Sequence, residues 1–169
     1  MARKVALELL LSDHVGDCMG PCHVTCPAKM DIPLMIRQIA GGKFDEAIRT
    51  VKKDIPIPAV LGRICPAPCE NACRRRLHDG AVSICLLKRF VADTDLGCGE
   101  PYLPEVVTRQ NKRVAIIGGG CVGLTAAYYL QAGGFDCRVF DGNEKAGGML
   151  RGEVKLPLNV LDAEIGIIE

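Results

Sequence analysis

The sequence lacks both a strong charge of one sign and a long apolar run. Its 169 residues carry a formal net charge of +1, so no long-range electrostatic field favours nucleic acid or an anionic membrane surface as a partner. No apolar stretch is long enough to span a bilayer. The apolar run at residues 5–11 contains Glu8, and no small-residue cleavage site follows it. We therefore expect a cytoplasmic chain with no membrane insertion and no nucleic-acid partner.

Residue groupings that mark a zinc site or a catalytic acid–base pair are also missing. Structural zinc sites often combine cysteines with histidines at short spacing, but the histidines here are scattered: His14, His23 and His78. No nucleophile is paired with a general base. Three acids are dispersed and expected to be solvated: Asp54, Glu70 and Asp93.

Cysteine, by contrast, is abundant, with ten residues in the chain. Six of them form two triplets with the pattern C-x3-C-x3-C: Cys18, Cys22 and Cys26, then Cys65, Cys69 and Cys73. Proline follows Cys26 and Cys65, as it often follows a ligand of an iron–sulfur cluster. Thiolates at this spacing can converge on a soft metal centre, and disulfides are unexpected in a chain without an export signal. The pattern favours iron–sulfur ligation over two remaining alternatives, structural zinc and inert buried thiols.

The N-terminal part of the chain is expected to be helical. Hydrophobic residues recur at helical spacing in three segments: 32–39, 44–51 and 82–93. Asp31 precedes the first segment as an expected N-cap. Ile55-Pro56-Ile57-Pro58 is expected to be a rigid non-helical connection, because proline disrupts helices. Residues 95–111 contain glycines and prolines without periodicity, which predicts a linker.

A glycine-rich loop follows this linker. Three glycines fit the pattern G-x-G-x-x-G: Gly118, Gly120 and Gly123. The loop comes after an expected buried strand at 113–117 and before an expected helix at 124–131, which is the setting of a dinucleotide site. Glycines there let the backbone approach a pyrophosphate, whose charge meets the helix N-terminus.

Only one further strand is expected, at residues 136–140, and Asp141 ends it at about the separation of a ribose-binding acid. An apolar pattern over residues 158–168 predicts a last helix. Two strands are too few to shield both faces of a sheet. We therefore expect either a fragment of a longer polypeptide or a unit that a partner chain completes.

The segment from Cys18 to Asp93 resembles the N-terminal iron–sulfur domain of the NADPH-dependent glutamate synthase small subunit, and the corresponding domain of dihydropyrimidine dehydrogenase. Residues 18–27, 62–73 and 82–84 carry the resemblance. Farther along, Gly147, Gly148 and the apolar pair after them resemble a stretch of that family's flavin domain. This second resemblance implies FAD rather than NAD at the glycine loop.

The resemblance implies two 4Fe–4S clusters with interleaved ligands. By position, one cluster takes Cys18, Cys22 and Cys73, and the other takes Cys26, Cys65 and Cys69. Each cluster then needs one more ligand. The family's cysteine before the first triplet is absent here, which leaves His14 or Asp17 as weak substitutes.

The fourth ligand of the second cluster also departs from the family. Relatives often use a carboxylate or amide at the position of Lys88, and a protonated ammonium cannot bind iron. Cys85 lies one turn earlier on the same helix face and is the expected ligand. Cys98 is expected to be a bystander with a minor chance of reaching a cluster, while Cys121 and Cys137 are expected to be packing residues.

These observations predict a mainly α iron–sulfur domain over residues 1–94, with an α-helical ferredoxin-like fold. A linker is expected at 95–111, and a partial α/β unit over 112–169, a Rossmann-type βαβ unit that binds FAD. The expected function is an electron-transfer subunit or fragment of a glutamate-synthase-like oxidoreductase, incomplete on its own, that relays electrons between flavin, clusters and another redox subunit. Two alternatives remain: a non-catalytic assembly module that holds clusters or zinc, and a ferredoxin-like carrier without flavin.

Overall fold

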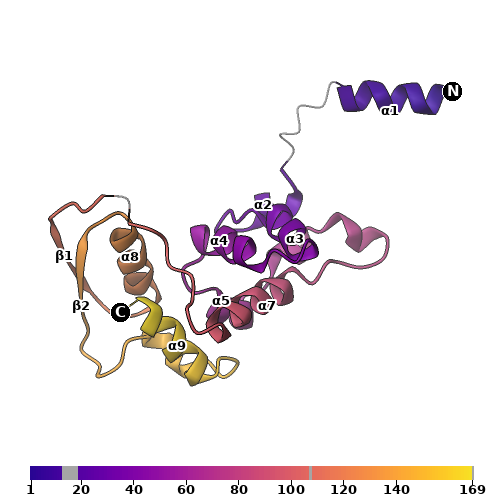
Figure 1. Ribbon diagram of the computed structural model, residues 1–169. Helices are drawn as coiled ribbons and strands as arrows, with labels where there is room; N and C mark the ends of the chain where they lie inside the picture. Colours follow the sequence, from indigo (N-terminus) through magenta and orange to yellow (C-terminus); the bar gives the residue numbers. More distant parts are fainter. Residues whose placement is uncertain (13–18, 107, 169) are drawn as a thin grey trace.

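A bundle of short helices is followed by a two-stranded parallel sheet with helices packed on one side (Figure 1). The computed structural model describes residues 1–12, 19–106 and 108–168. The helices of the first part are α1 (Ala2–Ser12), α2 (Pro21–Thr25), α3 (Ile32–Ala40), α4 (Phe44–Asp54), α5 (Pro58–Ile64), α6 (Pro68–Asn71) and α7 (Ile84–Gly97). The second part contains β1 (Arg113–Ile117), α8 (Cys121–Ala132), β2 (Asp136–Phe140) and α9 (Leu158–Ile168), and short 3-10 turns lie at Arg74–Leu77 and Gly148–Gly152. The predicted fold class is confirmed.

Local sequence accounts for the first long helices. The Asp31 carboxylate accepts a hydrogen bond from the Leu34 amide at 3.0 Å and so caps α3, as predicted. Helix α4 has acids in its first turn and lysines in its last, the arrangement that complements the helix dipole. Gly42 lies between the two helices with φ of +70°, a conformation that glycine adopts without steric cost.

Three predicted boundaries are wrong, and one of them is the start of the helix expected at 124–131, because α8 begins at Cys121. The expected rigid connection at 55–58 is shorter, because Pro58 opens α5 at a position where proline costs no helical hydrogen bond. The helix expected at 82–93 starts at Ile84 and continues to Gly97, into the segment expected to be linker. Helix α7 extends that far because Asp95 is buried against α4, where its carboxylate lies 2.6 Å from the Lys52 ammonium.

The buried Lys52–Asp95 ion pair also fixes the segment that leaves α7. The Lys52 ammonium donates to the Tyr102 carbonyl at 2.7 Å, and the Tyr102 amide donates to the Asp95 carboxylate at 2.9 Å. Both charges therefore have hydrogen-bonded partners, as buried charges require. The start of the predicted linker is thereby held against the helical core.

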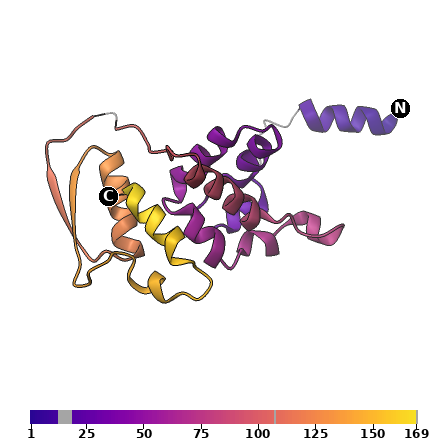
Figure 2. The same ribbon diagram turned by 60° about the horizontal axis from the view of Figure 1, so that its bottom comes forward.

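Strands β1 and β2 pair in parallel, with Arg113 opposite Asp136 and Ile117 opposite Phe140. Helices α8 and α9 lie on the side of the sheet that faces the helical bundle (Figure 2). The prediction of a buried first strand is wrong for most of its residues: Ile116 is buried, but Ile117 is 90% exposed. In the part of the chain that the structure describes, no element covers the other face of the sheet. Of the described helices, none is both long and apolar enough to cross a membrane.

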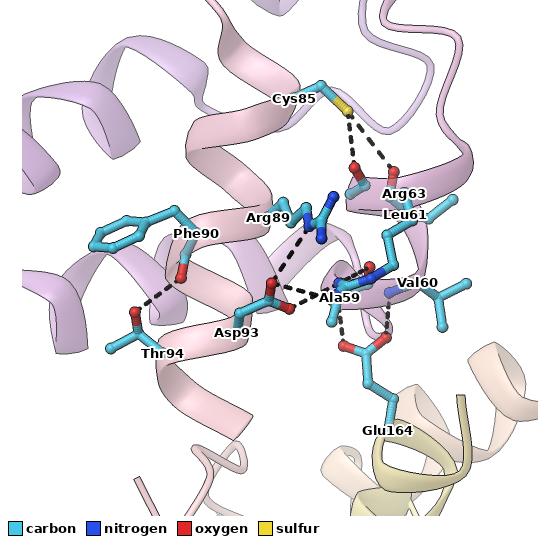
Figure 3. A network of polar contacts seen from close by, with 11 residues as sticks. Ala59, Val60, Leu61, Arg63, Cys85, Arg89, Phe90, Asp93, Thr94 and Glu164 are labelled. Atoms are coloured by element: carbon cyan, nitrogen blue, oxygen red, sulfur yellow. Dashed lines mark hydrogen bonds and ion pairs between the residues drawn. The ribbon is translucent and has the colours of Figure 1, made fainter. Parts of the chain in front are cut away.

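Helix α5 belongs to both hydrophobic cores. Ala59 packs with the core of the helical bundle, whereas Ile57 and Val60 pack with the core built around α8 and α9. The Glu164 carboxylate of α9 accepts hydrogen bonds from the Ala59 and Val60 amides, both at 2.7 Å (Figure 3). These two amides are free donors of the first helical turn. The two parts of the chain therefore pack directly against one another.

Glu164 makes the stability of this junction depend on pH. Burial raises its pKa from 4.5 to about 7, against the opposing effects of its two amide donors and of the Lys52 and Arg63 charges. The folded state then holds a proton that the unfolded state releases, so this stabilisation is present below about pH 4.5 and is lost as the pH rises through about 7. We expect the free energy of unfolding of the Glu164→Gln variant to lack this decline, which is on the order of 3 kcal/mol.

Denaturant unfolding of both proteins across that pH range measures the difference. The control is Asp162→Asn, which removes a half-exposed carboxylate from the same helix. A difference between wild type and Glu164→Gln that stays constant with pH would contradict the prediction.

Candidate functional site

Four of the expected ligands line one small cavity in the helical bundle: Cys26, Cys65, Cys69 and Cys85. They come from the ends of α2 and α5, from α6 and from the first turn of α7. The rest of the wall is proline, methionine and aliphatic side chains, apart from the largely buried residue Lys88. The cavity is therefore rich in sulfur donors and poor in other polar groups.

The two Cys-Pro steps position thiols at helix ends. Cys26 is the C-cap of α2, and Cys65 is the C-cap of α5. Both have extended backbone, because a residue before proline is disfavoured in the helical region. After Cys65, Ala67 adopts a left-handed conformation with φ of 51°, and its amide donates to the Cys65 sulfur at 3.4 Å. The sharp turn starts α6 at once and brings Cys69 to the same cavity.

Close packing of α5 against α7 brings Cys85 to this cavity. A Cβ atom on Gly62 would lie 2.7 Å from Arg89 Cβ and 2.9 Å from Arg89 Cα, so only glycine allows this approach. The Cys85 thiol donates to the Gly62 carbonyl at 3.6 Å, and Figure 3 shows its sulfur directed at the last turn of α5. The same packing is held by Arg63, which makes two hydrogen bonds to the Asp93 carboxylate, at 2.7 and 3.0 Å.

The expectation that Glu70 and Asp93 are only solvated is therefore wrong. The Glu70 carboxylate accepts a hydrogen bond from the Cys85 amide at 2.8 Å. It caps the first turn of α7 and ties the second cysteine triplet to that turn. Sequence reasoning missed Glu70, Gly62 and Arg63, since their partners lie 15 to 30 residues away. The one available signal was the place of Glu70 directly after Cys69.

The cavity disfavours the thiolate form of Cys69 and of Cys85. Burial raises the pKa of the Cys69 thiol to about 11, and the neighbouring Cys26 and Cys65 sulfurs add to the effect. Burial also raises the pKa of Cys85, while the Lys88 ammonium acts in the opposite direction. A metal that binds these sulfurs must therefore displace their protons.

The first expected cluster site is described only in part, because His14, Asp17 and Cys18 lie outside the described residues. Cys22 lies on α2 and is half-buried against the bundle core. Backbone N–H groups, first that of Val82 and then those of the arginine turn, lower the pKa of the Cys73 thiol. The arginine side chains of that turn are exposed, and Arg75 pairs with Asp79.

Within the described ranges, no three His, Cys, Asp or Glu side chains converge closely enough to hold a single metal ion. A 4Fe–4S cluster asks for a different arrangement, because each of its four irons takes one thiolate. The four-cysteine cavity fits that donor set. It also contains the Lys88 amine, which forms no hydrogen bond or ion pair with any described residue.

Cys98 lies apart from the cavity. Its thiol donates to the Asp95 carbonyl at 2.9 Å, at the C-terminal end of α7. Cys137 is half-buried against the second core, but Cys121 is exposed at the start of α8. The expectation that Cys121 is a packing residue is therefore wrong, because the residue is exposed and lines the groove beside the glycine loop.

The glycine-rich loop joins β1 to α8 with very close backbone contacts. Gly118 has φ of +102°, and its amide donates to the Phe140 carbonyl of β2 at 2.7 Å. A Cβ atom on Gly123 would lie 1.8 Å from the Gly118 oxygen, so the start of α8 packs directly on the loop. A groove beside the loop is lined by Gly118, Gly120, Gly123, Gly147, Gly148 and Met149, among others.

Asp141 lies against the same loop. Its carboxylate accepts a hydrogen bond from the Gly119 amide at 2.6 Å and another from the Asn143 amide at 2.8 Å. These two bonds, that of Gly119 first, lower the pKa of the Asp141 carboxyl group. The Gly147 amide donates to the Gly119 carbonyl at 2.7 Å. The loop, the acid and the later glycine pair therefore meet at the carboxyl end of the two strands.

Two families of known proteins match this chain. Residues 15–99 match the family described as dihydropyrimidine dehydrogenase domain II, 4Fe-4S cluster. Residues 116–166 match the family described as NAD(P)-binding Rossmann-like domain. An iron–sulfur domain followed by a Rossmann-like segment for a nucleotide cofactor is thus confirmed.

One relative of this chain is the NADPH-Fe(3+) oxidoreductase subunit beta of Geobacter sulfurreducens. The two are 37% identical over 156 residues, which cover 88% of this chain and 23% of the relative. The NADP(+)-dependent formate dehydrogenase subunit beta of Moorella thermoacetica is 35% identical, over 89% of this chain and 25% of the relative. The NAD-dependent dihydropyrimidine dehydrogenase subunit PreT of Escherichia coli is 37% identical, over 96% of this chain and 41% of the relative. The chain thus spans less than half the length of each.

Proposed function

Because the chain belongs to the dihydropyrimidine dehydrogenase domain II, 4Fe-4S cluster family, we propose that it is an electron-transfer module that holds two 4Fe–4S clusters and a flavin. The observation that carries the proposal is the cavity lined by four cysteines from four helices. Its sulfur donors, its apolar wall and its single amine suit an anionic cluster better than they suit any substrate.

We assign Cys26, Cys65, Cys69 and Cys85 to the second cluster. Cys18, Cys22 and Cys73 are assigned to the first, with His14 or Asp17 as the candidate for its remaining ligand. Helix α2 supplies Cys22 to one set and ends at Cys26 in the other. This overlap favours two clusters held side by side. We propose a cluster-bearing part that extends beyond the expected end at residue 94 to the end of α7 at Gly97, and a nucleotide-binding part over 112–169.

For the glycine loop we propose FAD as the nucleotide. The amides at the start of α8 would face its pyrophosphate, and the Asp141 carboxylate, held by Gly119, would accept from a ribose hydroxyl. The preference for FAD rests on Gly147 and Gly148, which line the groove beside the loop. Both have positive φ, which lets their backbone approach a ligand closely.

When bound, iron–sulfur clusters carry electrons, and a flavin exchanges them with nicotinamide cofactors or other redox centres. The chain's own residues hold these groups, limit water at the cavity and keep α5, α6 and α7 in fixed register through Glu70 and Asp93. The relatives are named as subunits, so we propose other redox subunits of a multi-subunit oxidoreductase as partners. Thiolate ligands must stay reduced, which favours the cytoplasm as the compartment.

Anaerobic purification with counts of iron, acid-labile sulfide and released flavin tests the proposal. We expect about eight irons and eight sulfides per chain, and a flavin signal on denaturation. Clusters without flavin would reduce the chain to a ferredoxin-like carrier. Zinc in place of iron and sulfide would leave only an assembly module and refute the proposal.

A further inference from the structure

Lys88 is a largely buried lysine at the four-cysteine cavity. It is 5% exposed, and it lines the cavity from α7, one helical turn after Cys85. No hydrogen bond or ion pair joins it to any other described residue. A buried charge normally has a partner, because leaving water without one is costly.

The cavity supplies no anion of its own to this amine. Among the described residues that line it, Lys88 is the only one other than the cysteines with a titratable side chain. The nearest acid on the facing helix α6 is Glu70, and its carboxylate is engaged with the Cys85 amide. A cluster with four thiolate ligands carries net negative charge, and one added electron makes it more negative.

We infer that Lys88 is the charge partner of the second cluster and sets its reduction potential. The inference rests on the proposed function, since it takes the cavity to be a cluster site. A fixed positive charge in a water-poor site favours the reduced cluster, which is the more negative of its two states. Reduction adds one electron from an external donor such as dithionite and breaks no bond to the ligands.

Three variants separate charge from packing. Lys88→Met and Lys88→Leu remove the charge and keep an apolar side chain, and Lys88→Arg keeps the charge. The control is Lys43→Met, which removes an exposed lysine at the start of α4. Each purified chain is reduced stepwise under anaerobic conditions, and the reduced clusters are followed by paramagnetic resonance. The second cluster is the signal that Cys85→Ala lacks.

We expect the neutral variants to lower the equilibrium constant for reduction of the second cluster at least tenfold, about 59 mV for one electron. Lys88→Arg and Lys43→Met should stay near the wild-type value. In the metal-free chain, Lys88→Met should raise Tm, because it removes a charge on a largely buried residue that has no acidic partner among the described residues.

The outcomes are distinct. An unchanged potential in a fully loaded Lys88→Met chain would overturn the inference, and so would failure of all three variants to load the second cluster, which would indicate a packing role. Loss of that cluster in the neutral variants alone would support the inference. Absence of iron and sulfide from the wild type would instead refute the proposed function.

Discussion

Replacement of Cys85 by alanine should remove the second cluster and leave the first. We expect iron and acid-labile sulfide to fall to about half, that is by about four irons per chain, because one of the four cavity thiols is lost. The chain should still fold, since the Cys85 thiol makes two long contacts to backbone carbonyls, at 3.6 and 3.9 Å, and one contact with the Cys65 thiol. Iron and sulfide assays, with paramagnetic resonance after dithionite reduction, measure the result.

The matched control is Cys98→Ala, which removes an exposed thiol that lies at the end of the same helix and away from the cavity. Its iron and sulfide content should equal that of the wild type. Full loading of Cys85→Ala would show that the fourth ligand lies elsewhere. If the iron and sulfide content of Cys98→Ala fell to half, Cys98 would be a cluster ligand rather than the bystander that we expect.

Replacement of Gly123 by alanine should disrupt the nucleotide site. The new Cβ would lie 1.8 Å from the Gly118 oxygen and 3.0 Å from its carbonyl carbon, so the start of α8 must move away from the loop. We expect a loss of stability of about 1–3 kcal/mol, as for other overpacked sites. Flavin affinity should fall at least tenfold, about 1.4 kcal/mol, because the helix N-terminus leaves the pyrophosphate position. Denaturant unfolding and flavin titration measure the two effects.

Gly166→Ala is the control for this variant. Gly166 lies on the exposed side of α9, and a Cβ there meets nothing within 4 Å. The substitution should raise stability by up to about 1 kcal/mol, since alanine favours helix more than glycine does, and flavin affinity should not change. Wild-type affinity in Gly123→Ala would mean that the glycine pattern has no role in binding.

Predictions that depend on near neighbours in the chain were accurate. The Asp31 cap and the end of α3 follow from residues three or four positions apart. Strand β2 has the predicted bounds, 136–140. The two Cys-Pro steps place thiols at helix ends through the steric effect of proline on the residue before it.

Predictions that depend on distant partners were less accurate. Sequence periodicity ended the seventh helix at residue 93, but the Lys52–Asp95 pair, 43 residues apart, carries it to Gly97. The sequence predicted a solvated Glu70, but the Glu70 carboxylate accepts a hydrogen bond from the Cys85 amide. The exposure of Ile117 likewise depends on which face of the sheet the helices cover.

The sequence by itself determined the two cysteine triplets, the glycine loop and the two strands beside that loop, because local sterics and short-range periodicity govern such features. Only the tertiary structure decided that Cys85 and Lys88 share a cavity with thiols of three other helices, and that Glu164 joins α9 to α5 across 105 residues. Those contacts follow from the close approach of α5 and α7 at Gly62 and from burial shared between two cores, which no segment specifies alone.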